Sequence, residues 1–309
     1  MLSTLRYVSD YLFALGGYLY GRTFRKTMNT TLTPIESRLQ LSPIVYRILG
    51  ANPSPLTLRG TNTYLVGNGK SRILIDTGES NVIQYIDELR EALGECSISS
   101  IICTHWHDDH VGGVSDVIDK IIGKSVPVYK FKRTDLNEND SKYHYVEDGY
   151  VLQTEGATLR LISTSGHTTD HMSIYLEEEN AVFSGDCILG EGTTIFEDLF
   201  TYMQSLNKLL QMKPTRIYPG HGPVIENPVE KIQEYINHRN QREQQILAVL
   251  SSCKTASSMH ITNEIYKDIS LGVKLGALNN VNHHLSKLLK ENKVQKIGVD
   301  SYRLVATSE

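Results

Sequence analysis

The chain has few cysteines, no membrane-length apolar run, and no internal repeat or low-complexity tract. Its four cysteines, at positions 96, 103, 187 and 253, show no CxxC or CxxxC spacing. This argues against a zinc finger and favours a reducing intracellular compartment over a disulfide scaffold. We expect all four to be small buried residues. The apolar run YLFALGGYLY is too short to span a bilayer and is interrupted by two glycines.

Excess charge of one sign is also lacking, since the net charge of the 309 residues is only -4. Its distribution is uneven: residues 1–30 and 229–309 each carry +3, and residues 31–228 carry -10. This asymmetry predicts a central part that holds cations and a C-terminal part able to face an anion. A hydrophobic content of 40% and a charged content of 21% are typical of an ordinary soluble globular protein.

Residues 1–30 contain no glutamate, carry four basic residues, and place Leu2, Leu5, Val8 and Leu12 at helical spacing. An amphipathic, arginine-bearing, acid-poor start predicts a mitochondrial presequence. We therefore expect the mitochondrial matrix, with the cytoplasm as the alternative location. A secretory signal peptide is the second interpretation, although no A-x-A-like cleavage site follows. The third is an extension that carries no targeting signal. No other segment resembles a membrane span, so we expect no membrane partner.

The pattern of the chain predicts three parts: an N-terminal extension (1–43), a catalytic domain (44–228) and a C-terminal unit (229–309). In the central part, short apolar runs closed by turn residues indicate strands, and three amphipathic stretches indicate helices. This mixture is typical of an α+β domain with helix-covered sheets. The predicted strands contain TYLVG, RILID, SISSIICT, SVPVYK, ATLRLISTS, MSIYLEEE, AVFSG and TRIYPG. The predicted helices are NVIQYIDELREALGE, residues 109–122 and FEDLFTYMQSLNKLLQM.

Three helices followed by a two-strand ribbon in the C-terminal unit predict a winged helix-turn-helix. The third helix, LGALNNVNHHLSKLLKENK, has a leucine-rich side, and its other face carries Lys287 and Lys290 with Lys293 just beyond. This basic face could hold phosphates. Alternatively, the unit braces the catalytic domain or mediates contacts in a homodimer.

One short stretch concentrates metal-binding side chains: THWHDDH, residues 104–110, lies between a β-branched run and two glycines. In extended chain a period of two places His105 and His107 on the same side. Asp109 and His110 fall at the start of the next helix, where they can point to a neighbouring position. The spacing therefore predicts two adjacent metal positions.

Asp76, His167, Asp186 and His221 each follow a β-run close to a glycine. These four side chains converge with the first stretch if their strands share one sheet edge. Imidazole and carboxylate without thiolate favour zinc or another divalent first-row ion.

These residues, in this order, resemble the metallo-β-lactamase superfamily, and the resemblance covers residues 44–225. It implies an αββα sandwich with the site along the edge between two sheets, followed here by the winged helix. It further implies that Asp186 bridges two Zn²⁺ ions and that Asp76 orients a ligand. The ligand sets that it implies are His105, His107 and His167 for one ion, and Asp109, His110 and His221 for the other.

Longer segments resemble the β-lactamase-like protein 2 family of animals: GTNTYLVG, THWHDDHVGG, GHTTDHM, SGDCILGEGTTIFEDL, YPGHGPVI and YINHRNQREQQIL. This resemblance implies a mitochondrial endoribonuclease that acts on single-stranded RNA. The 34 residues between Asp186 and His221 leave no room for the inserted domain of cleavage-and-polyadenylation-type nucleases. An open site of this kind suits an unstructured strand.

The expected mechanism follows from two neighbouring metal ions, where a bridging hydroxide attacks phosphorus in line. Asp109 is both an expected ligand and a proton acceptor. His171 is a candidate proton donor to the leaving oxygen or, alternatively, a hydrogen-bonding partner behind the ligands. Asn62 and Thr63 are candidate substrate contacts or, alternatively, stabilise a turn.

Three other functions remain open at this point. A glyoxalase II-type thioester hydrolase would use the same hydroxide on a carbonyl carbon, but its resemblance weakens after Asp186. A sulfur dioxygenase with one iron is disfavoured because Asp109, His110 and His221 complete a second site. An alternative of another class is a non-catalytic RNA-binding protein with a relic metal site.

Overall fold

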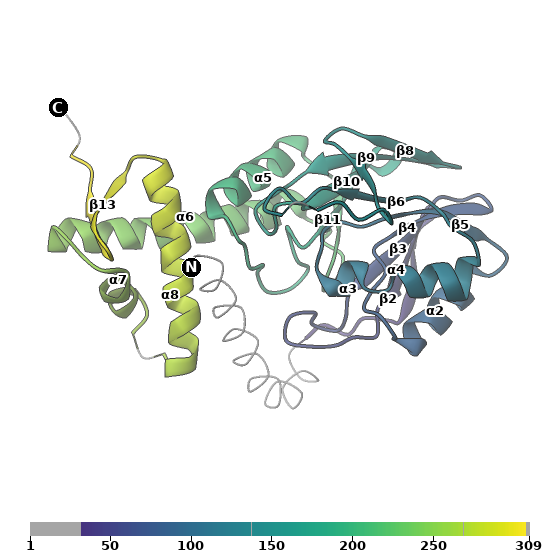
Figure 1. Ribbon diagram of the computed structural model, residues 1–309, viewed down its shortest axis with the longest axis horizontal. Helices are drawn as coiled ribbons and strands as arrows, with labels where there is room; N and C mark the ends of the chain where they lie inside the picture. Colours follow the sequence, from purple (N-terminus) through teal and green to yellow (C-terminus); the bar gives the residue numbers. More distant parts are fainter. Residues whose placement is uncertain (1–31, 137, 268, 307–309) are drawn as a thin grey trace.

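The computed structural model describes residues 32–306 except 137 and 268, so the predicted presequence lies outside the described residues. Two sheets face each other in the larger part, and a smaller helical unit follows (Figure 1). The strands of the seven-stranded sheet are β1 (Arg38–Ser42), β2 (Val45–Leu49), β3 (Asn62–Val66), β4 (Ser71–Ile75), β5 (Ser97–Ile102), β6 (Val128–Phe131) and β7 (His144–Val146). The strands of the five-stranded sheet are β8 (Val151–Thr154), β9 (Ala157–Ser163), β10 (Met172–Leu176), β11 (Ala181–Gly185) and β12 (Arg216–Pro219).

Helices cover the outer faces of both sheets (Figure 1). The helices of this part are α2 (Ile83–Leu93), α3 (Asp108–Val111), α4 (Val114–Val117) and α5 (Leu199–Met212), with the short turns η1 (Ile118–Ile122) and η2 (Glu177–Glu179). α2 and α4 pack on the seven-stranded sheet, and α5 packs on the five-stranded sheet. The predicted α+β fold, an αββα sandwich, is confirmed.

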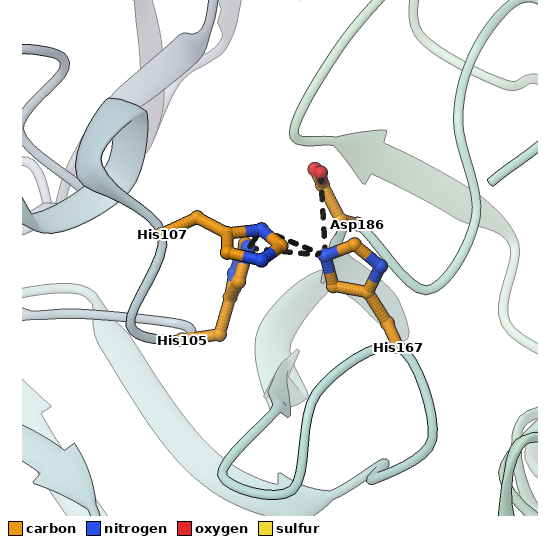
Figure 2. Close-up of side chains that lie close together, drawn as sticks. All are labelled: His105, His107, His167 and Asp186. Carbon is orange, nitrogen blue, oxygen red and sulfur yellow. Dashed lines mark hydrogen bonds and ion pairs between the residues drawn. The ribbon is translucent and has the colours of Figure 1, made fainter. Parts of the chain in front are cut away.

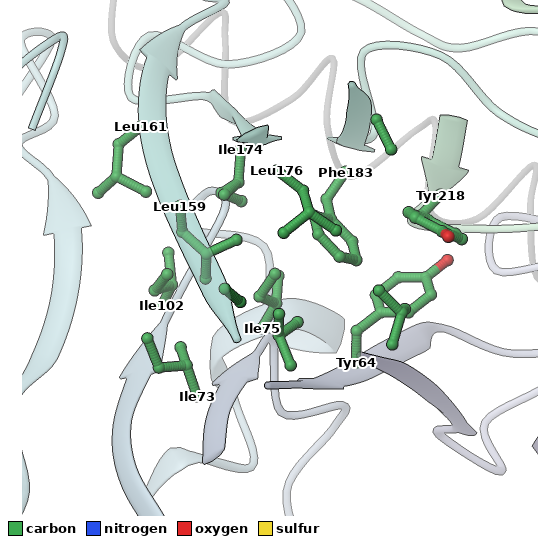
Figure 3. Close-up of a cluster of buried hydrophobic side chains, with 14 of the residues drawn as sticks. Tyr64, Ile73, Ile75, Ile102, Leu159, Leu161, Ile174, Leu176, Phe183 and Tyr218 are labelled. Atoms are coloured by element: carbon green, nitrogen blue, oxygen red, sulfur yellow. The ribbon is translucent and has the colours of Figure 1, made fainter. Parts of the chain in front are cut away.

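The core between the sheets explains the alternating apolar pattern of the strands. Figure 3 shows its members pointing inward from both sheets: Tyr64, Ile73, Ile75 and Ile102 from one, and Leu159, Leu161, Ile174, Leu176, Phe183 and Tyr218 from the other. The rings of Tyr64 and Phe183 meet at a centroid distance of 5.0 Å. Each fully buried side chain of this size contributes about 1.5–3 kcal/mol relative to exposure.

Strand direction places several strand ends at one edge. β4 and β5 run parallel, as do β11 and β12, while β10 is antiparallel to both β9 and β11. The C-terminal ends of β4 and β5 therefore lie on one side of the first sheet, and those of β9, β11 and β12 lie on one side of the second. The Tyr64 hydroxyl donates to the carbonyl of Pro219 at 2.7 Å and ties the two sheets together there.

The helix predicted over residues 109–122 is broken into α3, α4 and η1. The break falls at Gly112 and Gly113. A Cβ atom on Gly113 would lie 2.1 Å from the carbonyl oxygen of Thr77, so glycine allows the helix to approach the turn after β4. The residues that begin α3 are thereby held against the strand ends.

The C-terminal unit consists of α6 (Pro228–Cys253), α7 (Ser258–Ile265), α8 (Leu271–Lys290), β13 (Val294–Gly298) and β14 (Ser301–Leu304). α6 begins under α5 and extends out to α7 and α8 (Figure 1). The three helices and the ribbon are those predicted from the sequence, and Val281, Leu285 and Leu288 are buried as expected.

The prediction that one face of α8 displays its lysines is partly wrong. Lys287 is buried and pairs with the buried Glu243 of α6, and Lys293 contacts the same carboxylate at 3.0 Å. Lys290 pairs with Asp198 at the start of α5. These charges bind α8 to α5 and α6, as the bracing alternative requires.

Two further expectations need correction or comment. Cys253 is exposed at the end of α6 and Cys96 is only half-buried, so the prediction of four buried cysteines is wrong for both. β1 lies ahead of residue 44, where the sequence places the start of the catalytic domain. No helix among the described residues is long and apolar enough to cross a membrane.

Candidate metal centre

Seven histidine and aspartate side chains meet at the shared edge of the two sheets. Each lies directly after a strand or at the first turn of the helix that follows it. His105 and His107 follow β5, Asp109 and His110 begin α3, and His167, Asp186 and His221 follow β9, β11 and β12. They form two groups: His105, His107, His167 and Asp186 in one, and Asp109, His110 and His221 in the other.

The first group brings three imidazoles together around one point (Figure 2). Nε2 of His105 lies 2.9 Å from Nδ1 of His107 and 3.2 Å from Nε2 of His167. Nδ1 of His107 and Nε2 of His167 are 3.1 Å apart. Three nitrogens bound at about 2.0–2.1 Å to one tetrahedral zinc ion would be about 3.3 Å apart, so the spacing fits a single ion.

The second group is arranged around the carboxylate of Asp109. Its Oδ2 lies 3.2 Å from Nε2 of His110 and 3.2 Å from Nε2 of His221. Asp186 lies between the groups: its Oδ2 is 3.7 Å from Nε2 of His167, and its Oδ1 is 3.3 Å from Nε2 of His221. One carboxylate thus presents one oxygen to each group, the geometry of a bridging ligand.

The donor set fits divalent metal ions by a second criterion. Nε2 of His110 and Oδ1 of Asp186 are buried in the site and make no hydrogen bond among the described residues, although polar atoms of the cluster lie 3.2 Å to 3.4 Å away. Buried polar atoms without partners are costly and rare. A bound cation would satisfy both of them.

The far sides of two imidazoles, those of His110 and His167, are held by partners that leave the other nitrogen facing the site. Nδ1 of His110 donates to Oδ2 of Asp76 at 2.7 Å, and Nδ1 of His167 donates to the carbonyl of Ile195 at 2.7 Å. Such a bond keeps a proton on Nδ1, so that the neutral ring offers its Nε2 lone pair to a metal. Asp76 thus lies behind His110 and orients its ring.

The two groups differ in their electrostatics. Burial holds the pKa of His105 and His167 below the usual value, and it lowers the pKa of His107 to about 3. Burial also opposes charge on His221, but Asp186 and Asp109 outweigh it and raise the pKa to about 9. His110 is likewise raised well above its ordinary pKa, because Asp109, Asp76 and Asp186 overcome its burial. These shifts favour neutral imidazoles in the first group and protonated imidazoles in the second, where a metal ion would have to displace protons.

Two threonines support the site without having been predicted. The hydroxyl of Thr61 donates to Oδ2 of Asp109 at 3.1 Å. Thr104 donates its backbone N–H and its hydroxyl to the two oxygens of Asp76, at 2.8 Å and 2.9 Å. Thr104 directly precedes His105, so its place in the motif is a signal for its role. Thr61 lies in the segment GTNTYLVG, but nothing local in the sequence links it to Asp109, 48 residues away.

His171 is fully buried, and both of its ring nitrogens are engaged. Nδ1 lies 2.9 Å from the hydroxyl of Thr164, and Nε2 accepts the backbone N–H of Asp186 at 3.1 Å. Burial also lowers its pKa well below the usual range. The geometry therefore corrects the proton-donor expectation: His171 positions the backbone of Asp186.

Asn62 and Thr63 are also buried in the structure rather than open to a substrate. The Asn62 amide donates to the carbonyls of Pro219 and Gly222, each at 2.9 Å, and so holds the turn that carries His221. The Thr63 hydroxyl donates to the carbonyl of Ile48 at 3.0 Å. The turn-stabilising alternative fits Asn62, whereas Thr63 joins β3 to its neighbour β2 instead of a turn; neither residue is placed as a substrate contact.

Two family models match the chain. The metallo-beta-lactamase superfamily model matches residues 56–221, which include all seven clustered side chains. The beta-lactamase associated winged helix domain matches residues 257–301, so the predicted winged helix is confirmed.

Similar proteins extend over nearly the whole chain. A beta-lactamase-like protein 2 homolog from Caenorhabditis elegans is 50% identical over 281 residues, covering 90% of this chain and 95% of the relative. The Drosophila melanogaster homolog is also 50% identical, covering 85% and 93%. A crystal structure of a beta-lactamase domain protein from Burkholderia ambifaria superimposes with a TM-score of 0.74 at 17% identity, covering 90% of this chain and 96% of that one, which shows the fold alone.

Proposed function

Because the chain belongs to the metallo-β-lactamase superfamily, together with the β-lactamase-like protein 2 homologues, we propose that it is a dinuclear zinc endoribonuclease that cleaves single-stranded RNA. The observation that carries the hydrolytic chemistry is the pair of donor groups joined by Asp186. Other divalent first-row ions suit the same nitrogen and oxygen donors.

Two bound ions would lower the pKa of a water between them and polarise the phosphate, supplying a nucleophile at neutral pH. The chain's residues keep this site in order. His105, His107 and His167 would hold one ion, and Asp186 would offer its carboxylate to both donor groups. We assign the role of proton acceptor to the carboxylate of Asp109, whose side chain is 18% exposed.

Single-stranded RNA is proposed as the substrate for two reasons. The family resemblance implies it, and the segment between Asp186 and His221 contains only a loop, α5 and β12. No inserted domain covers the site from this segment, so a flexible strand can reach the metal groups. We further propose that the protein acts in the mitochondrial matrix. Its proposed protein partner is a second copy of the chain, and we propose no membrane partner.

The test incubates purified, zinc-loaded protein with end-labelled single-stranded RNA, with the same RNA as a duplex, and with an acyl-glutathione thioester. We expect internal cleavage of the single strand and much slower cleavage of the duplex. Thioester hydrolysis without RNA cleavage would refute the proposal and favour the glyoxalase II-type alternative. RNA binding without any cleavage would favour the non-catalytic alternative.

Matched variants identify the source of the activity. Asp186→Ala and His107→Ala remove a ligand from the site, and each should abolish cleavage. His144→Ala removes an exposed histidine on β7 and should leave cleavage unchanged. RNA cleavage by the ligand variants at the wild-type rate would assign the activity to a contaminant. Metal analysis that found one iron per chain would favour the dioxygenase.

A further inference from the structure

The loop between Asp186 and α5 touches the donor groups on one side and the C-terminal helices on the other. On the site side, the Ile195 carbonyl accepts from Nδ1 of His167, and the Gly190 N–H donates to the carbonyl of His221 at 2.8 Å. The loop therefore holds two ligand residues besides following Asp186 directly. Residues 186–198 contain no helix or strand of their own, so their conformation depends on what packs against them.

α6 supports the loop through two residues one turn apart, in addition to contacts from α5 and from Ser184. The Tyr235 hydroxyl accepts the N–H of Leu189 at 3.2 Å and donates to the carbonyl of Gly192 at 3.1 Å. Arg239 donates from Nη2 to the hydroxyl of Thr193 at 2.5 Å and to the carbonyl of Thr194 at 3.2 Å. Both side chains are almost fully buried.

Arg239 reaches the loop as an unpaired cation. No ion pair among the described residues includes it, and its guanidinium lies 5.0 Å from the ring centroid of Phe196. The same ring packs against His283 of α8 at 5.4 Å. A buried arginine without a carboxylate is costly unless neutral acceptors and a ring face compensate it. The acceptors of Nη2 belong to the loop, while Nη1 lies 3.1 Å from Nδ1 of the neighbouring His238.

The chain of contacts from Arg239 to the metal groups is short. Arg239 binds the carbonyl of Thr194; the Thr194 hydroxyl donates to the carbonyl of Ile195 at 3.1 Å; and that carbonyl accepts from His167 at 2.7 Å. A displaced Ile195 carbonyl would release the His167 ring and its tautomer. A ligand ring without this partner binds metal more weakly.

We infer that Arg239, supported by Tyr235, is a positioning residue through which α6 of the C-terminal unit holds His167 for metal binding. The C-terminal unit thus acts on the catalytic chemistry without contacting the reacting atoms. This inference concerns metal affinity at the three-histidine group, and it stands whether or not RNA is the substrate.

The test measures metal binding in the full-length chain by chelator competition with Zn²⁺ and by the visible absorption of bound Co²⁺. Arg239→Ala should weaken binding at the three-histidine group about ten-fold or more, as loss of an orienting partner does, and should change the Co²⁺ spectrum. Arg239→Lys should rescue little, because lysine lacks the planar fork and the stacking face. Arg242→Ala, on the same helix but stacked on Tyr266 at 4.1 Å, is the matched control and should bind as wild type.

Tyr235→Phe provides a milder variant in case Arg239→Ala does not fold, since it removes only the hydroxyl that holds the loop. It should weaken metal binding several-fold with an unchanged circular dichroism spectrum. Wild-type affinity and an unchanged Co²⁺ spectrum in a folded Arg239→Ala or in Tyr235→Phe would overturn the inference. Absence of RNA cleavage by wild type would instead refute only the proposed function.

Discussion

At the scale of single residues, the two donor groups differ in the protons that they carry. The imidazoles of His105, His107 and His167 are kept neutral by burial, while His110 and His221 are charged by the carboxylates around them. Metal binding requires neutral imidazole, so an ion competes with protons only in the second group. The same side-chain type therefore provides two sites with different pH dependence.

This difference predicts the order in which ions load. The pKa of His221 is raised to about 9 and that of His110 is raised well above its ordinary value, so below pH 9 binding of the second ion must displace protons. Affinity for that ion should rise with pH, by about ten-fold per unit for each proton displaced. The first ion should show little change above pH 6, because the pKa of His107 is about 3.

Competition titrations with Zn²⁺ at pH 6 and pH 8.5 measure both affinities. We expect one tightly held ion at pH 6 and two at pH 8.5. The reverse order, or equal pH slopes for both ions, would contradict this electrostatic account. A His221→Ala chain serves as the control, because it should bind one ion at either pH.

At the scale of elements, the site depends on tight turns after the strands. Gly220 in the turn after β12 lies against the turn after β11, and a Cβ there would meet Oδ1 of Asp186 at 2.5 Å and the carbonyl oxygen of Gly185 at 3.0 Å. The two turns carry Asp186 and His221. Their close approach sets the distance between these two side chains.

Gly220→Ala should therefore push Asp186 away from its bridging position. We expect metal affinity to fall by about 10–100-fold, the range seen when ligand support is lost, with loss of hydrolytic activity. Gly276→Ala is the control, since no atom lies within 4 Å of its added Cβ; within α8 it should stabilise the fold by up to about 1 kcal/mol. Wild-type zinc affinity in Gly220→Ala would refute the argument from close approach.

At the scale of the whole molecule, α6 belongs to two cores. Ile232 and Ile236 pack in the cluster under α5, and Ile246 and Leu250 pack with α7, α8 and the ribbon. Because one continuous helix passes through both, and charged pairs tie α8 to α5 and α6, the two parts are expected to unfold together.

Leu250→Ala tests this coupling. It should cost about 2–5 kcal/mol, the range for truncating a buried leucine, and should shift unfolding of the catalytic domain as well. The single tryptophan, Trp106, lies beside His107 with a ring distance of 4.5 Å and reports on the metal site, while far-UV circular dichroism reports on the helices. Both midpoints should fall together. A drop in the dichroism midpoint alone would show two independent units; exposed Val299→Ala should change neither.

The fold was largely predictable because its signals are local. Strand and helix periods near β3, β4, β9 and α5 depend on neighbours in sequence, and so do the turns that follow the strands. β1, β2, β7 and β8 were not predicted as strands. The sequence predicts the helix after Asp109 but not its break at Gly112 and Gly113. The break depends on the close contact between Gly113 and the carbonyl of Thr77, which only the folded chain brings about.

The sequence by itself determined the chemistry available at the strand ends, since the residue types there are those that bind zinc, and it determined the αββα sandwich and the winged helix through periodicity and resemblance. Only the tertiary structure decided which way each side chain faces. It turned His171 and Asn62 inward as supports, paired Lys287 with Glu243, and brought Arg239 to the loop behind His167. These contacts join residues far apart in the chain, so their geometry exists only once the sheets and helices have packed and water has been excluded between them.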